Sequence, residues 1–196
     1  MQKSEAVEIK VFDMVPDILI AQVDQLLEKN GSNNRIKNEV SLSAWSKERF
    51  INKNDRFKYI VALIYNKVVG IIILWKRTIQ YYGKPIIVGG LGGVGVQKEY
   101  RGRGIATSML THAKQTLDFS DSDVAFLGTD INDPQMLKIY GRIGFVPLKK
   151  AFTYIGKSGK HYKDPTAGMI APIHSQKLYK EILKGVEPFH IGIGTW

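Results

Sequence analysis

The segment that most constrains this chain is Gly89–Met109, GGLGGVGVQKEYRGRGIATSM, where a glycine-rich apolar run leads to an arginine–glycine turn and then to an amphipathic pattern. A strand with so few side chains leaves its backbone open to another hydrogen-bonding partner. The turn Arg101–Ala106 precedes the amphipathic pattern, so its amides should lie at a helix N-terminus, where partial positive charge favours anions. We therefore expect a strand, an anion-binding turn that suits a diphosphate, and a helix. An exposed loop without a ligand is the alternative reading of a short arginine–glycine run.

Hydrophobic periodicity predicts the remaining elements. Two tight turns, Asn66-Lys67 and Tyr82–Pro85, should join successive strands into hairpins. The strand–helix–strand core with antiparallel flanks predicts an α+β sandwich, and we expect one domain over residues 1–196. Strands are expected at residues 7–12, 57–65, 68–77, 86–96, 124–127, 145–155 and 166–173, an extended tail at 187–196, and helices at 16–29, 45–52, 105–117, 134–143 and 175–183.

The chain has no cysteine, which excludes a disulfide framework, a thiolate metal site and a cysteine nucleophile. We expect no bound metal and a cytoplasmic location. The longest apolar run, Val68–Trp75, is far shorter than the ~20 residues of a membrane span.

Positive charge is concentrated in one arm of the sequence. The formal net charge is +10, and residues 134–163 contain seven Lys or Arg and no Asp or Glu. An acidic partner is expected near this arm: a phosphorylated cofactor, an acidic carrier protein, a nucleic acid or an anionic membrane surface. A solvated basic face with no partner is the competing interpretation.

Two segments, VGVQKEYRGRGIATSML and DPQMLKIYGRIGF, together resemble the signature segments of the GNAT acyltransferase superfamily. In that family the pattern Gln/Arg-x-x-Gly-x-Gly/Ala binds the coenzyme A pyrophosphate, and Arg101, Gly104 and Ala106 match it here. Tyr140 and Gly144-Phe145 match the second segment. The resemblance implies an αβα sandwich whose mixed, mostly antiparallel sheet is splayed at the cofactor strand.

The same resemblance implies roles for individual residues. The backbone of Val94 and Val96 would bind the pantetheine arm, and Tyr140 would donate a hydrogen bond or a proton to the departing thiolate. The diphosphate would be bound by the turn and first helical residues, namely Arg101, Gly102, Arg103, Gly104, Ile105, Ala106 and Thr107.

The C-terminal third resembles, more narrowly, the branch that holds aminoglycoside 2'-N-acetyltransferases and nodulation-factor N-acyltransferases. That resemblance implies that the Trp196 carboxylate, a catalytic candidate, belongs to the acceptor site and that Glu187 lines it. Gly92 stands where the antibiotic-modifying relatives carry a glutamate as probable base, and the basic charge argues against an aminoglycoside substrate. Asp133, where many members have an asparagine, should cap the helix that begins at Pro134.

The resemblance implies an N-acyltransferase that uses acetyl-CoA on a primary amine of a small molecule, a sugar or a peptide by direct attack. Such an amine is protonated at neutral pH, so a proton acceptor is needed. Candidates are a water relay, Trp196, Glu187, His174 and His190, whereas His112 should be structural or exposed. Two alternatives are transfer of a longer acyl group from acyl carrier protein and a non-enzymatic nucleic-acid-binding role. A homodimer is also possible.

Overall fold

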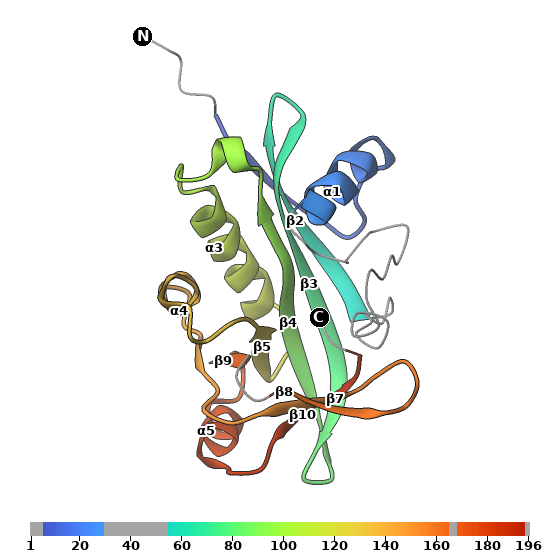
Figure 1. Cartoon of the computed structure of the whole chain (residues 1–196), viewed down its shortest axis with the longest axis vertical. Helices are drawn as coiled ribbons and strands as arrows, with labels where there is room; N and C mark the ends of the chain where they lie inside the picture. The colour runs from blue at the N-terminus through green and yellow to red at the C-terminus, as the bar shows by residue number, and fades with distance from the viewer. Residues whose placement is uncertain (1–5, 30–54, 165–167, 195–196) are drawn as a thin grey trace.

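The computed structural model describes residues 6–29, 55–164 and 168–194. They form a large sheet covered by helices on both faces and a small sheet packed beside it (Figure 1). No helix in these ranges is long and apolar enough to cross a membrane.

The large sheet has seven strands in the order β1-β2-β3-β4-β5-β9-β6. Neighbouring strands are antiparallel except β4 and β5, which run parallel. The predicted mixed, mostly antiparallel sheet is therefore confirmed. The strands are β1 (Glu8–Phe12), β2 (Arg56–Ile64), β3 (Lys67–Tyr81), β4 (Lys84–Val96), β5 (Val124–Gly128), β6 (Val146–Pro147) and β9 (Gly168–Pro172).

Both predicted hairpins are present, and each closes with a two-residue turn of positive φ. The first turn is Tyr65-Asn66, with φ of 47° and 63°, one residue earlier than the predicted Asn66-Lys67. Lys67 already pairs with Ile64, so it belongs to β3. The second turn is Tyr82-Gly83, with φ of 47° and 75°. Turns of this kind match the right-handed twist of paired strands, which explains how β2, β3 and β4 pair over long stretches.

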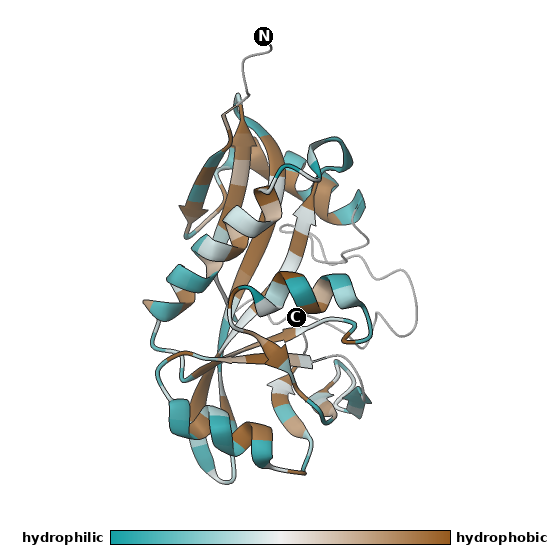
Figure 2. Ribbon diagram, turned by 90° about the vertical axis from the view of Figure 1, so that its left-hand side faces the viewer, coloured by the Kyte–Doolittle hydropathy of each residue, from teal (hydrophilic) through white to brown (hydrophobic). Residues whose placement is uncertain are grey.

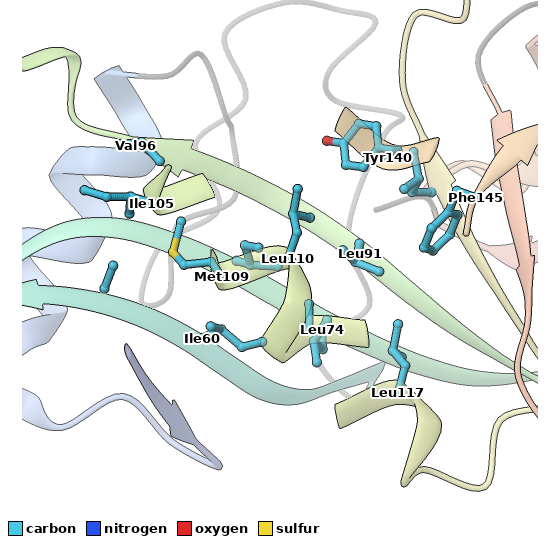
Figure 3. Packing of buried hydrophobic residues seen from close by; sticks show 14 of the residues in the cluster. Ile60, Leu74, Leu91, Val96, Ile105, Met109, Leu110, Leu117, Tyr140 and Phe145 are labelled. Atoms are coloured by element: carbon cyan, nitrogen blue, oxygen red, sulfur yellow. The ribbon is translucent and has the colours of Figure 1, made fainter. Parts of the chain in front are cut away.

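Two helices cover one face of the large sheet, which we call the α3 face. These are α3 (Ile105–Asp118) and α4 (Pro134–Gly141), and the short 3-10 helix η2 (Lys98–Tyr100) precedes α3. The apolar stripe of α3 packs on β2, β3 and β4, and Figure 3 shows Met109, Leu110 and Leu117 against Ile60 and Leu74. In Figure 2 the strands of this sheet are mainly hydrophobic, whereas the helices alternate hydrophobic and hydrophilic positions.

The opposite face, which we call the α1 face, is covered in two parts. Helix α1 (Asp17–Lys29) packs Val23 and Leu27 against Ile73 and other side chains of β2 and β3. Further along the sheet, the small sheet and α5 (Gln176–Lys184) cover Ile79 and Val88.

The small sheet corrects one sequence prediction. Its strands are β7 (Phe152–Ile155), β8 (His161–Asp164) and β10 (Phe189–Ile193), in the order β10-β7-β8. The single strand predicted at 145–155 was wrong, because β6 pairs with β9 in the large sheet and the chain turns at Leu148–Lys150 before β7. Leu148 N–H makes the next hydrogen bond toward β9, to Gly168 O at 2.8 Å. The extended tail predicted at 187–196 contains β10 in its described part, and the predicted helix 45–52 lies outside the described residues.

A buried arginine fastens the small sheet to the large one. Nε of Arg77, on β3, donates to Asp55 Oδ2 at 2.9 Å, and Nη2 donates to the same oxygen. Nη1 donates to the carbonyls of Ile191 at 2.7 Å and Gly194 at 2.9 Å. Gly192 and Gly194 have φ of 86° and 77°, which lets the chain curl around the guanidinium. One side chain thus joins the start of β2, the middle of β3 and the end of the described chain.

Burial works against both charges of this pair. It raises the pKa of Asp55 and lowers the pKa of Arg77, and in each case the effect of burial exceeds that of the opposite charge. Removing one partner would therefore leave the other as an uncompensated buried charge.

We expect Arg77→Leu to lower the free energy of unfolding by about 3–5 kcal/mol, because Asp55 would lose its counter-charge. The double variant Asp55→Leu/Arg77→Leu should be more stable than Arg77→Leu alone. Urea unfolding of the four proteins of the cycle measures both effects.

Lys76→Met is the matched control, because Lys76 Nζ pairs with Asp121 at 2.9 Å on the surface. It should change stability by less than about 1 kcal/mol. A loss in Arg77→Leu no larger than in Lys76→Met would show that the buried pair does not hold the sheets together.

Candidate active site

The site begins where β4 and β5 part. The two strands pair in parallel from Val88–Val124 to Leu91–Leu127, and β5 ends at Gly128. Strand β4 continues to Val96, paired with β3 along its other edge. From Gly92 onward the edge of β4 on the β5 side therefore has no strand partner within the described residues. This confirms the predicted splay at the cofactor strand.

A β-bulge distorts β4 at the same place. Ile71 pairs with Gly95 and Ile73 with Gly92, so two β4 residues, Gly93 and Val94, lie opposite a single residue of β3. Gly93 has φ of +59°, and a Cβ there would lie 3.1 Å from side-chain atoms of Ile73 and Leu27. Only glycine fits this backbone easily. The bulge bends the strand and re-aims the backbone groups beside it.

The two valines predicted to bind the pantetheine arm differ in their surroundings. Val94 is half-buried at the bulge. The carbonyl of Val96 accepts a hydrogen bond from Arg101 Nε at 3.0 Å, and its side chain packs in the core of the α3 face. Val94 is therefore the more accessible of the two, and the cofactor role of both residues stays a prediction.

The chain then turns sharply between β4 and α3. Gln97 anchors the turn: its backbone N–H donates to Val69 O at 2.9 Å and its side chain donates to Val68 O at 2.5 Å. Residues 101–104 are exposed. Gly102 and Gly104 both have φ of +78°, and nothing lies within 4 Å of a Cβ built on either. The two glycines thus provide the backbone conformation and leave open space above it.

The N-terminus of α3 has no side-chain cap. Its N-cap is Gly104, which makes no side-chain hydrogen bond, and the first bond within the helix is Ser108 N–H to Gly104 O at 3.0 Å. By helix geometry the N–H groups of Ile105, Ala106 and Thr107 point out of the helix end. Three converging amides at the positive end of a helix are suited to bind an anion.

The two arginines of the turn have different contacts. Arg101 ties the turn to the end of β4 through Val96 O. Arg103 lies over the ring of Tyr100, with its guanidinium carbon 5.0 Å from the ring centroid. Lys67 Nζ lies 5.3 Å from the same centroid. Arg103 and Lys67 therefore place positive charge beside the turn, next to Glu99 of η2, and Arg101 also has a structural role.

Tyr140 lies near the end of α4, a helix built as the sequence predicted. Asp133 Oδ1 caps it, accepting from Gln135 N–H at 2.8 Å and Met136 N–H at 3.4 Å. The Tyr140 side chain belongs to the same core as Leu91, and Figure 3 shows its hydroxyl pointing away from Phe145. Burial raises the pKa of Tyr140. The phenol therefore keeps its proton over a wider pH range than an exposed tyrosine, and a donor role for its hydroxyl stays a prediction.

The remaining candidates are scattered. Trp196 lies outside the described residues, so its predicted role stays a prediction. His174 binds Ser120 O just before β5 begins, at the end of that strand far from the splay. Glu187 is exposed, and His190 lies on β10, on the α1 face. Among the described residues no group of three or more His, Asp or Glu side chains could hold a metal ion.

Sequence reasoning missed the Arg77–Asp55 pair and the contact of His161 with His190, whose ring centroids are 6.2 Å apart. The one signal for the pair was a pair of charges, Lys76 and Arg77, directly after the continuous apolar run Val68–Trp75. Nothing in the sequence indicated which residues would face either group.

Several solved structures share the fold. A chain of the NatC complex bound to Gag peptide and CoA matches with a TM-score of 0.58 at 18% identity, covering 85% of this chain and 98% of that one. The GNAT family N-acetyltransferase YhbS from Escherichia coli, solved in complex with CoA, matches with a TM-score of 0.58 at 14% identity, covering 98% and 93%. At these identities the likeness establishes the fold alone.

Two curated relatives align over shorter stretches. An N-alpha-acetyltransferase MAK3 from Arabidopsis thaliana is 36% identical over 59 residues, which is 30% of this chain and 31% of the relative. N-alpha-acetyltransferase 30 from Saccharomyces cerevisiae is 29% identical over 75 residues, 38% of this chain and 43% of the relative. The chain thus aligns with less than half the length of either relative.

A family profile described as the acetyltransferase (GNAT) domain matches residues 33–148, more than half of the sequence. That range contains the splayed strand, the glycine turn, the uncapped helix end and Tyr140. The chain belongs to the GNAT acetyltransferase family.

Proposed function

We propose that this protein is an N-acetyltransferase that transfers the acetyl group of acetyl-CoA to a primary amine in a ternary complex. The observation that carries the proposal is the free edge of β4, which leads from the bulge at Gly93 to the amides at the N-terminus of α3. The edge suits an extended amide chain such as pantetheine, and the helix end suits a diphosphate.

In the proposed mechanism the donor binds along β4 on the β5 side. The diphosphate accepts hydrogen bonds from the amides of Ile105–Thr107, with Arg103 and Lys67 adding positive charge. The pantetheine arm pairs with the backbone near Val94, whose N–H polarises the thioester carbonyl. This arrangement holds the thioester at the splay, where an amine can approach it, and positioning contributes much of the rate.

The amine attacks the carbonyl carbon, and the tetrahedral intermediate expels the thiolate of CoA. Tyr140 is suited to stabilise that thiolate by a hydrogen bond. Full proton transfer from a phenol of ordinary pKa of about 10 to a thiolate of pKa of about 8.5 is uphill by ~2 kcal/mol. Burial raises the pKa of Tyr140 further, which favours donation of a hydrogen bond over loss of the proton.

The amine also loses a proton. Of the predicted acceptors, His174 is disfavoured by its position at the far end of β5, and His190, Glu187, Trp196 and a water relay stay open. The acceptor molecule is a small molecule, a sugar or a peptide. The names of the two aligned relatives make the α-amine of a polypeptide one class to test first.

Tyr140→Phe should lower kcat by about 10²–10³-fold while leaving the affinity for acetyl-CoA nearly unchanged, because negative charge develops on sulfur as the thiolate leaves and is absent from the bound thioester. Steady-state kinetics and calorimetric titration with CoA separate the two effects. The wild-type rate should show no loss from Tyr140 ionisation up to the usual pKa of a phenol, about 10. Equal losses of rate and affinity would indicate that Tyr140 only packs the core.

Gly102→Asp should raise the KM for acetyl-CoA about tenfold, equivalent to ~1.4 kcal/mol, because a carboxylate would stand beside the bound diphosphate. Acetyl-S-pantetheine, which lacks the diphosphate, should be unaffected.

Gly159→Asp is the matched control for this charge, because Gly159 also has positive φ and open space around its Cβ position. Its effect on both donors should be small. If Gly102→Asp changed the two donors equally, the diphosphate would not lie at this turn.

Transfer of a longer acyl group is tested by the same assay with octanoyl-CoA and octanoyl acyl carrier protein. We expect acetyl-CoA to be the best donor. A kcat/KM higher for octanoyl acyl carrier protein than for acetyl-CoA would show that acetyl-CoA is not the preferred donor.

A further inference from the structure

The small sheet has one face that the proposed donor site does not use. Register pairs His190 of β10 with Thr153 of β7, and Thr153 with Lys163 of β8. Paired residues point to the same side of a sheet, so these three share a face. His161 pairs with Ile155 two residues along β7, and therefore lies on this face as well. We call it the outer face; the inner face buries Phe152, Tyr154 and Phe189 in the core.

The two histidines approach each other across β7. Their ring centroids are 6.2 Å apart and the rings are stacked at 28°, although β7 separates their strands. Thr153 Oγ1 lies 3.0 Å from His190 Nδ1 and fixes the orientation of that ring. His190 Nε2 has no hydrogen-bond partner in the part of the chain that the structure describes. A ring held by one nitrogen can offer the other to a ligand.

Among the described residues of β7, β8 and β10, Lys163 is the charged side chain that register places on this face beside the histidines, whereas Asp164 pairs with Phe152 and belongs to the inner face. Lys163 shares the face with His190, and Lys160 lies over the neighbouring Tyr162 ring, 5.6 Å from its centroid. Arg77 contributes positive charge from β3, tempered by its partner Asp55. Burial lowers the pKa of His190, and His161 and Arg77 lower it further. An anion on this face would be attracted by the lysines and would raise the pKa of His190.

The small sheet and the proposed donor site lie against opposite faces of the large sheet. Tyr140 and α3, beside the proposed donor, lie on the α3 face of the large sheet. The small sheet lies on the α1 face, where Arg77 fastens β10 to β3. The small sheet covers the large sheet at Ile79 and Val88, and β4 parts from β5 after Leu91, so an acceptor amine at the splay can extend its other groups toward the small sheet.

We propose that the outer face, defined by Thr153, His161, Lys163 and His190, binds an anionic substituent, a carboxylate or a phosphate, of the acceptor amine. The inference rests on the proposed function and adds the acceptor's charge class to it. The side chains act by binding: the histidine Nε2–H and the lysine ammonium donate to the anion.

Proton NMR of the histidine Cε1–H signals tests binding without activity. The chain has four histidines, and His190→Asn assigns the relevant signal. Inorganic phosphate and succinate, in separate titrations, represent the two anion sources. At least one should raise the pKa of His190 by about one unit, which corresponds to about tenfold tighter binding to the protonated form. The signals of His112 and His174, which lie on other elements, should not move.

Kinetics with matched acceptors tests the role. Peptides with Asp-Glu after the first residue are compared with Asn-Gln peptides, and free glutamate with glutamine. We expect the acidic member of at least one pair to have about tenfold higher kcat/KM, with the advantage falling as pH rises and His190 loses its proton. Lys163→Met should reduce that advantage without changing the KM for acetyl-CoA, and Lys157→Met, at the exposed hairpin tip, should preserve it.

The two outcomes are separable from the proposed function. If no amine is acetylated and yet an anion raises the pKa of His190 without moving the signals of His112 and His174, the proposed function fails and the anion site stands. If amines are acetylated with no preference for acidic acceptors, or if all four histidines respond equally, the anion site is wrong and the acetyltransferase stands.

Discussion

The parting of β4 from β5 is the constraint on which the rest of the site depends. Two parallel strands that pair through Leu91 and Leu127 and then separate leave one half-buried edge of β4 without a strand partner in residues 55–164 and 168–194. Unpaired backbone groups away from water are costly, so such an edge persists where another partner completes it. The bulge at Gly93 and the sharp turn into α3 suit the same partner. Both leave backbone N–H groups available, first on β4 and then at the N-terminus of α3.

Packing on the two faces of the large sheet positions different parts of the site. On the α3 face, apolar packing of α3 and the end of α4 fixes the helix N-terminus and Tyr140 relative to β4. On the α1 face the core is split between α1 and the small sheet, and Arg77 stands between the two parts. The four hydrogen bonds of this buried guanidinium have fixed directions, so they define the relative position of the segments they join, which apolar packing does less strictly. Its hydrogen bonds to Ile191 and Gly194 fix β10 against β3, and this fixes the position of the outer face.

Local patterns predicted much of this arrangement. The apolar runs of β2 and β3, the proline and aspartate at the start of α4, and the glycines of the turn can each be read from a few neighbouring residues. The resemblance to GNAT signature segments, based on Arg101–Ala106 and Tyr140, predicted the family. The errors came where contacts between distant residues determine the structure. In the sequence β6 and β7 look like one strand, and they are separate because β6 pairs with β9 and β7 pairs with β10. The Arg77–Asp55 pair and the histidine contact also join segments far apart in the chain, so no local signal could show them.

Amide hydrogen exchange with and without CoA tests the central claim most directly, because it reads the backbone groups themselves. We expect CoA to slow exchange at the amides of residues 102–107 and at Val94, and to leave the outer strands of the large sheet unchanged. Protection confined to other parts of the chain, or no change at saturating CoA, would contradict a donor site built from the free edge of β4 and the N-terminus of α3.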